Sequence, residues 1–413
     1  MSGIIVQKFG GTSVADVERI RRAAGRAVAA RRAGKKTVVV VSAMGHATDD
    51  LLDLGSQMKP SITASADREM DALAATGEQV SASMMALAIQ EQGVPARSFL
   101  GHQIRIRTDR AFMRARIRAI ESEALLASLT AGEVAVVAGF QGVDDQGNIT
   151  TLGRGGSDTT AVAIAIAVGA DECEIYTDVP GVLTADPRIC PDARIIERIA
   201  HEEMLELASL GTNVLQTRSV ELAMKYGVPV RVRSSFDDGP GTLVVPDAGD
   251  LEARVVNGVA HDDNQTKISI VGIVDEPDAL ARLFKPLADD NISVDLIVHS
   301  VADNGRMTVS FTLGKEDVDR AVASVRRVME ELRGSEMRVD PDVVKVSIVG
   351  LGMRSRAGVA QQMFAILCRE HIPIQLAVST EIKVSCVIPS RYCELAVRAL
   401  HHGFGLAQGT AAP

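Results

Sequence analysis

Aromatic residues are scarce in this 413-residue chain, which has no tryptophan and only 3% aromatic residues in total. So few rings leave little surface on which nucleic-acid bases could stack. The formal net charge of −9 also opposes binding to a phosphate backbone, which needs clustered lysine and arginine. We therefore expect no nucleic-acid partner.

Long apolar runs and paired cysteines are absent too. No apolar stretch approaches the roughly 20 residues that span a membrane, and residues 1–8 are typical of a strand and not of a signal peptide. The five cysteines are odd in number and scattered, and no His/Cys spacing suggests a metal site. These features predict a cytoplasmic protein with reduced thiols, no membrane partner and no metal held by the protein itself.

Glycine is concentrated in the segment 151–161, Thr-Leu-Gly-Arg-Gly-Gly-Ser-Asp-Thr-Thr-Ala, which runs into the apolar stretch 161–168. The apolar stretch predicts a buried helix, so the glycines lie at its N-terminus, where free N–H groups favour an anion. Arg154 adds a guanidinium group suited to a carboxylate or phosphate. The alternative is a plain loop before a helix capped by residues 157–160. Capping alone needs neither three glycines nor an arginine, so the sequence favours an anion site.

Apolar strands and helical patterns alternate through the first 245 residues, which predicts βαβ units and a mostly parallel sheet. Ligands of such sheets bind at the carboxyl ends of the strands, where the glycine turns 8–14 and 153–156 would meet. Neither turn has the glycine spacing of a Walker A motif or a Rossmann fingerprint. Buried strands are expected at residues 4–6, 37–41, 133–138, 172–176 and 228–232.

The pattern changes after a polar linker near residues 246–252. Strand, helix, strand, strand and helix follow in the same order twice, over residues 267–332 and 345–403. This repetition predicts a duplicated ferredoxin-like βαββαβ unit. The second copy ends before its last strand, and residues 254–259 could supply that strand and interlock the two copies.

Three cations are expected at one mouth of the sheet: Lys8, Arg154 and Arg188. One polyanion and one carboxylated substrate together would use that many positive charges. Glu78 is a candidate partner for a substrate ammonium group. Simpler roles stay open for these groups taken singly, because a lysine can be solvated and the carboxylates at 78, 158 and 178 can cap helices or form turns.

The chain resembles, over nearly its whole length, the aspartate kinases, which combine the amino-acid-kinase fold with paired ACT domains. The motifs that carry the resemblance stand in the family's order: Lys8-Phe-Gly-Gly-Thr-Ser13, Ser42-Ala-Met-Gly45, Thr76-Gly-Glu-Gln79, Gly139-Phe-Gln-Gly142, Gly153-Arg-Gly-Gly-Ser-Asp158, Ala185-Asp-Pro-Arg188 and Arg233-Ser-Ser-Phe236. It implies an α/β fold, with a three-layer, mostly parallel sheet followed by two ACT domains. The implied domains are a catalytic domain at 1–245, a linker and shared strand at 246–263, and ACT domains at 264–340 and 341–413.

The resemblance also implies ATP-dependent phosphorylation of the L-aspartate side chain to 4-phospho-L-aspartate, the first step of aspartate-family amino-acid biosynthesis, with Mg²⁺ on the nucleotide phosphates. Lys8 would compensate charge on the transferring phosphoryl group, and Asp158 would orient Lys8. The implied substrate residues are Thr48, Glu78, Arg154, Gly155, Gly156 and Ser157. The implied nucleotide residues are Lys8, Phe9, Gly10, Gly11, Ser42, Thr177, Asp178, Leu183, Asp186, Arg188 and Asn213, of which Leu183 and Asn213 depart from the family's usual residues.

An amino-acid effector is implied at the interface of the ACT pair, although several positions there depart from the family. Asp278 stands where ACT domains usually have a glycine that lets the effector approach the backbone. We hypothesise that feedback by lysine or threonine is weakened or lost, as would suit a dedicated pathway. The implied effector positions are Asp275, Asp278, Ala279, Asn291, Asp295, His299, Ser300 and Thr380.

The resemblance further implies a homodimer or larger homo-oligomer, assembled through the ACT domains. Three alternatives to an aspartate kinase are considered. One is a kinase of the same fold that acts on another amino-acid carboxylate, and the second is a non-catalytic regulatory paralogue. The third, a nucleic-acid-binding ACT regulator, would need a basic stripe that the sequence lacks.

Overall fold

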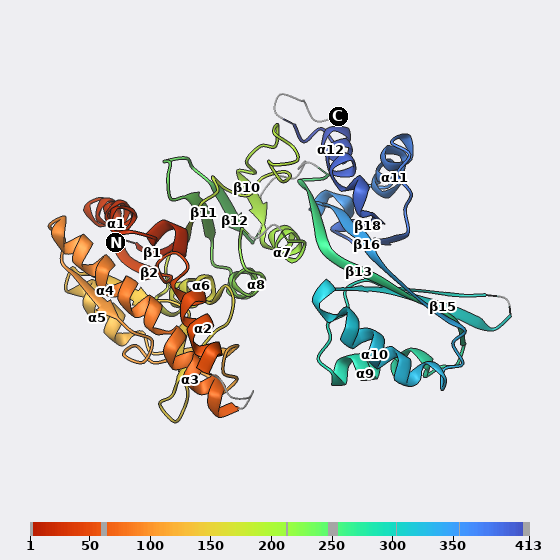
Figure 1. Cartoon of the computed structure of the whole chain (residues 1–413). Helices are drawn as coiled ribbons and strands as arrows, with labels where there is room; N and C mark the ends of the chain where they lie inside the picture. Colours follow the sequence, from red (N-terminus) through yellow and green to blue (C-terminus); the bar gives the residue numbers. More distant parts are fainter. Residues whose placement is uncertain are drawn as a thin grey trace. The chain divides into compact units, whose positions relative to one another are not determined.

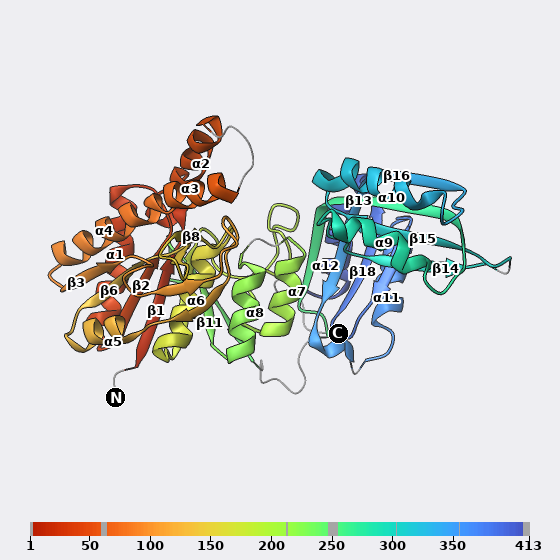
Figure 2. The same cartoon turned by 90° about the horizontal axis from the view of Figure 1, so that it is seen from below.

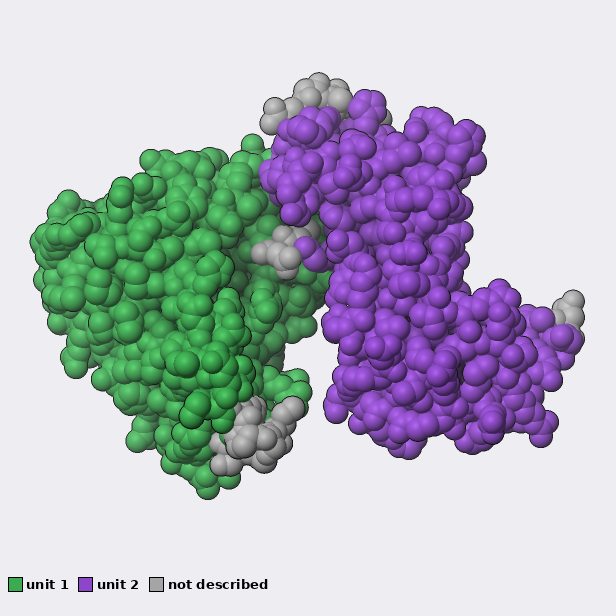
Figure 3. Space-filling model, in the orientation of Figure 1, with its two compact units in different colours: residues 1–182, 195–209, 213–250 green, residues 183–194, 210–212, 251–413 purple. Residues whose placement is uncertain are grey.

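The computed structural model describes residues 3–58, 64–211, 214–246, 255–302, 304–354 and 356–407. Two compact units are coloured separately in Figure 3. The first consists of Met1–Val182, Ile195–Ser209 and Asn213–Asp250, and the second of Leu183–Arg194, Leu210–Thr212 and Leu251–Pro413. The short segment 183–194 therefore belongs to the second unit, although the chain on both sides of it belongs to the first.

An eight-stranded sheet forms the centre of the first unit, in the order β10-β12-β11-β9-β1-β2-β6-β3 (Figure 1). All neighbouring strands are parallel except β11 and β12, so the prediction of a mostly parallel sheet is confirmed. The strands are β1 Ile4–Phe9, β2 Lys36–Val41, β3 Ala96–Phe99, β6 Val134–Ala138, β9 Glu172–Thr177, β10 Arg198–Ala200, β11 Val230–Ser234 and β12 Thr242–Val245.

Helices cover both faces of this sheet, which explains why central strands such as β2 and β6 are almost entirely valine and alanine. Helices α1 (Val17–Arg32) and α4 (Thr76–Glu91) share one apolar core with alternating residues of β1, β2 and β6. Helix α6 (Gly156–Val168) packs against β1 on the other face (Figure 2). The unit's remaining helices are α2 Ala47–Met58, α3 Ala64–Ala74, α5 Glu123–Thr130, α7 His201–Ser209 and α8 Thr217–Tyr226.

A second, four-stranded sheet in the first unit was not predicted. Its order is β5-β4-β7-β8, with β4 Ile106–Thr108, β5 Ile117–Ile120, β7 Gln141–Val143 and β8 Ile149–Thr151. The strands are too short to show periodicity in the sequence. Asp71 of α3 ties this sheet down, since its buried carboxylate accepts hydrogen bonds from the N–H and hydroxyl of Thr151 and the N–H of Met113.

The second unit is built on one antiparallel sheet, in the order β14-β15-β13-β16-β18-β17. Its strands are β13 Gly258–Val274, β14 Ile297–Val301, β15 Arg306–Leu313, β16 Glu336–Val349, β17 Leu376–Ser379 and β18 Lys383–Pro389. Its helices are α9 Ala279–Asp289, α10 Val318–Met329, α11 Val359–Arg369 and α12 Cys393–Gly403. Strand β14 begins at Ile297, although Asp295 and Leu296 already exchange backbone hydrogen bonds with Thr312 of β15.

Two long strands interlock the duplicated halves. The start of β13 (258–262) pairs with the end of β16 (345–349), and the end of β13 (267–271) pairs with the start of β16 (336–340). Each half therefore receives its last strand from the chain that forms the first strand of the other half. The predicted interlocking is present, although the donated strand begins at Gly258 and continues without a break into the next one.

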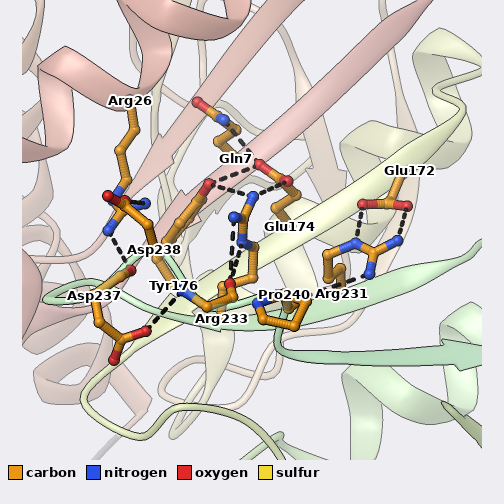
Figure 4. Close-up of polar contacts among 11 residues, drawn as sticks. Gln7, Arg26, Glu172, Glu174, Tyr176, Arg231, Arg233, Asp237, Asp238 and Pro240 are labelled. Atoms are coloured by element: carbon orange, nitrogen blue, oxygen red, sulfur yellow. Dashed lines mark hydrogen bonds and ion pairs between the residues drawn. The ribbon is translucent and has the colours of Figure 1, made fainter. Parts of the chain in front are cut away.

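A buried polar network lies on the α1 side of β1, β9 and β11 (Figure 4). Glu174 accepts hydrogen bonds from Gln7 Nε2 at 2.8 Å, Tyr176 Oη at 2.9 Å and Arg233 Nη1 at 3.0 Å. Glu174 is 6% exposed, so these three donors replace the water molecules that would otherwise hydrogen-bond its carboxylate. Each of the three strands contributes a residue, so the network holds β1, β9 and β11 in register. Lys8 follows Gln7 in β1, and its side chain therefore points to the opposite face of the sheet.

Among the described residues, no helix has both the length and the apolar character needed to cross a bilayer.

Replacing Arg233 with methionine should lower the free energy of unfolding by about 3 kcal/mol, because Glu174 would keep a buried charge without its cation. The measurement is urea unfolding of the full chain, monitored by circular dichroism. Arg21→Met is the matched control, since Arg21 and Glu91 also pair at 3.0 Å but both are more than half exposed; this change should cost less than about 1 kcal/mol. Equal losses in the two variants would contradict the role given to the network.

Candidate active site

Lys8 and Asp158 meet at the carboxyl end of β1. Lys8 Nζ lies 2.6 Å from Oδ1 of Asp158, which belongs to the first turn of α6, and both side chains are about one-tenth exposed. A Cβ at Gly10 would come within 3.4 Å of Nζ, so the glycine turn keeps space open next to the ammonium group. The structure thus joins the two residues predicted to act together.

The glycine segment before α6 adopts a conformation that side chains would disfavour. Gly153 and Gly155 have φ values of 76° and 72°, in the left-handed region. Gly155 is the N-cap of α6, and no side chain caps the helix. Thr159 and Thr160 instead donate to the carbonyls of Gly155 and Gly156. The alternative of a helix capped by residues 157–160 is therefore wrong. The N–H of Gly156 donates to the carbonyl of Gly153, so the N–H groups of Ser157 and Asp158 are the ones in the first turn that could bind a ligand.

Arg154 projects from the middle of this glycine segment. It is exposed, and it makes no ion pair within the described ranges of the chain. A guanidinium group beside a helix N-terminus can bind a carboxylate or phosphate through two parallel hydrogen bonds, in a bidentate arrangement.

Glu78 lies at the start of α4 and is 3% exposed. Its Oε1 accepts a hydrogen bond from the N–H of Ala43 at 3.1 Å, whereas Oε2 is buried with no hydrogen-bond partner. Burial raises the pKa of Glu78 to about 7, although the Ala43 N–H and the charge of Lys8 lower it. A buried acceptor without a donor is costly, and a bound ammonium group would supply the missing donor.

Small residues bring the neighbouring polar groups close. A Cβ at Gly77 would lie 3.6 Å from Thr48 Oγ1, and a Cβ at Gly139 would lie 2.9 Å from Ser157 Oγ. Gly139 follows β6 and donates to Val41 at the end of β2. The predicted substrate residues are therefore gathered at the ends of β1, β2 and β6, where α4 and α6 begin.

The predicted nucleotide residues of the first unit lie at the ends of β1, β2 and β9. Gly11 accepts a hydrogen bond from the N–H of Gly45, and Ser42 donates its N–H to Phe9. Phe9 is fully buried, its ring stacks on Tyr176 with centroids 4.8 Å apart, and its carbonyl accepts the N–H of Ser42, so Phe9 shapes the strand end from below. At the end of β9, Thr177 donates its hydroxyl to Asp178 at 3.1 Å.

Three other predicted nucleotide residues, Leu183, Asp186 and Arg188, belong to the second unit. Arg188 is exposed and pairs with Asp186 at 2.6 Å, and this hydrogen bond holds the pKa of Asp186 below its usual range. Asn213 lies outside the described residues. The expected convergence of three cations stays a prediction for Arg188.

Arg218 and Gln216 support the site and were not predicted. Arg218 at the start of α8 donates to the carbonyls of Leu152 and Ala115 at 2.6 and 3.1 Å. A Cβ at Gly155 would overlap the side chain of Gln216, at 1.9 Å. Through these contacts, residues at the start of α8 and just before it support the backbone of the glycine segment. No sequence signal could reveal them, because they join segments that are far apart in the chain, 66 residues for Leu152 and 103 for Ala115.

Three of the eight predicted effector positions in the second unit are engaged with protein groups. Asp278 precedes α9 and its carboxylate lies 3.4 Å from Arg282 Nε, while Asp295 contacts the ammonium group of Lys345, which is 4% exposed. Thr380 Oγ1 accepts a hydrogen bond from the N–H of Lys383. Ala279 is buried. The other positions, Asp275, Asn291, His299 and Ser300, are exposed.

Comparison with known proteins agrees with this architecture. Residues 3–234 match the amino acid kinase family, and residues 268–329 and 346–404 match the ACT domain. The aspartate kinase of Pseudomonas putida is 48% identical over 404 residues, which cover 98% of both chains. The chain belongs to the aspartate kinase family.

Further members of the family resemble the chain over its whole length. Aspartokinase 2 of Bacillus subtilis is 45% identical over 98% of both chains. The crystal structure of E. coli aspartokinase III in complex with aspartate and ADP is 27% identical, with a TM-score of 0.81 over 97% of this chain and 99% of that one. The fold predicted from the sequence, an amino-acid-kinase sheet followed by ACT domains, is confirmed.

Glu78→Gln should make the ligand-free protein more stable at alkaline pH. The pKa of Glu78 is about 7 in the folded chain against a reference of 4.5, so between these values the folded state holds a proton that the unfolded state releases, and stability falls as pH rises. Glutamine does not titrate, so the free energy of unfolding of the variant should exceed that of wild type by up to about 3 kcal/mol at pH 8. At pH 5 the two proteins should differ little. Thermal unfolding across this pH range measures the difference, and parallel curves would contradict a buried carboxyl at this position.

Proposed function

We propose that this chain transfers the γ-phosphoryl group of ATP to the side-chain carboxylate of L-aspartate, giving 4-phospho-L-aspartate. The observation that carries the proposal is the buried oxygen of Glu78 without a partner, on the same sheet edge as the Lys8–Asp158 pair. A free α-amino acid offers an ammonium group for Glu78 and an α-carboxylate for the unpaired Arg154. Family membership supports the same reaction, because the similar proteins are aspartate kinases.

The chemistry asks for alignment and charge compensation. The attacking carboxylate is already an anion at neutral pH, so no general base is required. Lys8, oriented by Asp158, would stabilise charge on the transferring phosphoryl group, and the N–H groups at the start of α6 would assist it. Mg²⁺ would arrive on the nucleotide phosphates and neutralise their charge. Thr48 and Ser157 would add hydrogen bonds that fix the substrate.

Trapping the acyl phosphate with hydroxylamine tests the reaction directly. Purified full-length protein with ATP, Mg²⁺ and L-aspartate should form aspartyl hydroxamate, whereas N-acetyl-L-aspartate should give none because it lacks the ammonium group. Activity with the N-acylated compound alone would identify a kinase for another carboxylate. No activity with either would indicate a regulatory paralogue.

Arg154→Ala and Lys8→Met should separate binding from chemistry. Removing the Arg154 guanidinium should raise the aspartate KM on the order of 100-fold, because a charged hydrogen bond to the α-carboxylate is lost. Removing the Lys8 ammonium should instead lower kcat by roughly 100-fold or more. Steady-state kinetics provide both values. Arg21→Met is the control, and an unchanged aspartate KM in Arg154→Ala would refute the assigned role.

We further propose that the ACT pair responds weakly to lysine and threonine and that the chain forms at least a homodimer through it. Lys345 already pairs with Asp295, and Asp278 is the N-cap residue of α9. If an effector approached this turn with its carboxylate, it would meet the carboxylate of Asp278. Like charges would repel the effector at that turn.

At millimolar concentration, lysine and threonine, alone or together, should change the rate less than twofold in the hydroxamate assay. Asp278→Gly removes the repelling carboxylate and should increase any response, while Asp289→Gly on the far end of α9 serves as the control. Strong inhibition of the unmodified protein would overturn this part of the proposal.

A further inference from the structure

Among the residues that the structure describes, one group of three side chains has donor atoms that could share a metal ion: Cys190, Asp192 and His401. The thiol sulfur, a carboxylate oxygen and a ring nitrogen all lie within 4.8 Å of one another. All three residues belong to the second unit. Their positions in the sequence conceal the group, since His401 is on α12 and the other two are in the segment 183–194.

The histidine ring is held in an orientation that suits a ligand. Nε2 lies 2.9 Å from the hydroxyl of Thr184, which also accepts the N–H of Arg194 at 3.1 Å. When Nε2 carries the ring proton and donates it to Thr184, the lone pair of Nδ1 faces Asp192. Metal-binding histidines are usually oriented in this way by a hydrogen bond from the second nitrogen.

The spacing and exposure of the donors fit an ion better than a direct contact. Nδ1 of His401 and Oδ1 of Asp192 are 3.9 Å apart, too far for a hydrogen bond. Two ligands at about 2.1 Å from a tetrahedral ion lie about 3.4 Å apart, so the exposed Asp192 side chain would close the remaining gap when the ion binds. Cys190 and His401 are each 1% exposed, whereas the Asp192 side chain is 55% exposed and leaves an entry path.

We propose that Cys190, Asp192 and His401 bind a divalent ion of the zinc type, with water as the fourth ligand. Sulfur, imidazole and carboxylate together are a donor set typical of Zn²⁺. On binding, the Cys190 thiol loses its proton to solvent and its thiolate bonds to the ion.

The ion would reinforce existing bonds between the segment 183–194 and the rest of the second unit. Thr184 accepts a hydrogen bond from the N–H of Val259 at 2.8 Å, and Arg194 donates to the carbonyl of Leu406 at 3.0 Å. The same segment carries Asp186 and Arg188, so the ion would also fix two residues proposed for the nucleotide. That consequence rests on the proposed function, whereas the binding site does not.

Cobalt provides the test, because Co²⁺ occupies zinc sites and a cobalt–thiolate bond absorbs in the near ultraviolet. Full-length protein stripped with EDTA and titrated with Co²⁺ should develop a thiolate-to-cobalt band that saturates at one ion per chain. Excess Zn²⁺ should abolish the band. Hydroxamate activity is measured in parallel, so failure of the metal site and failure of the proposed function are distinguishable.

Cys190→Ser and His401→Gln should lose the charge-transfer band or weaken cobalt binding at least tenfold. Cys368→Ser and His402→Gln are the matched controls, since both residues are exposed, and they should leave the titration unchanged. If the buried variants fail to fold, Asp192→Asn, at an exposed position, should still weaken binding. Absence of a stoichiometric band, or a band that persists in Cys190→Ser, would overturn the proposal.

Discussion

The contact between Lys8 and Asp158 constrains the whole first unit, because two nearly buried charges have to meet at one point of the sheet. Taking a lysine out of water is affordable only when an opposite charge is fixed beside it. The observed strand order meets that requirement, because β1 lies near the centre of the sheet and the first turn of α6 lies at the end of β1. The parallel arrangement then brings the loops after β2 and β6 to the same edge.

Two groups of opposite charge at this edge of the sheet, Glu78 and Arg154, are available to a ligand. Among the residues that the structure describes, Glu78 has a buried oxygen without a donor and Arg154 makes no ion pair, while Lys8 is paired with Asp158. An ammonium group and a carboxylate are the chemical complements of Glu78 and Arg154. A buried oxygen without a donor lowers the free energy of unfolding, and binding sites often retain such destabilising groups because function needs them.

Two long antiparallel strands play the corresponding role in the second unit. Since β13 and β16 each run through both halves, neither half has a complete sheet without the other. Each half nevertheless has its own apolar core, under its own pair of helices. Such an arrangement can transmit a change in one half through shared backbone hydrogen bonds, which is a suitable property for a regulatory module.

The sequence by itself determined the fold class and most of the candidate site. Valine-rich strands predicted the parallel sheet, repeated patterns predicted the duplication, and the glycines around Arg154 predicted a helix N-terminus free for a ligand, because these signals are local. Tertiary contacts decided that α2 begins at Ala47, that the short four-stranded sheet exists, and that β13 is continuous. They also decided the pKa of Glu78, the bracing by Arg218 and the meeting of Cys190 with His401. These features depend on burial and on contacts between distant segments, which no local pattern of residues encodes.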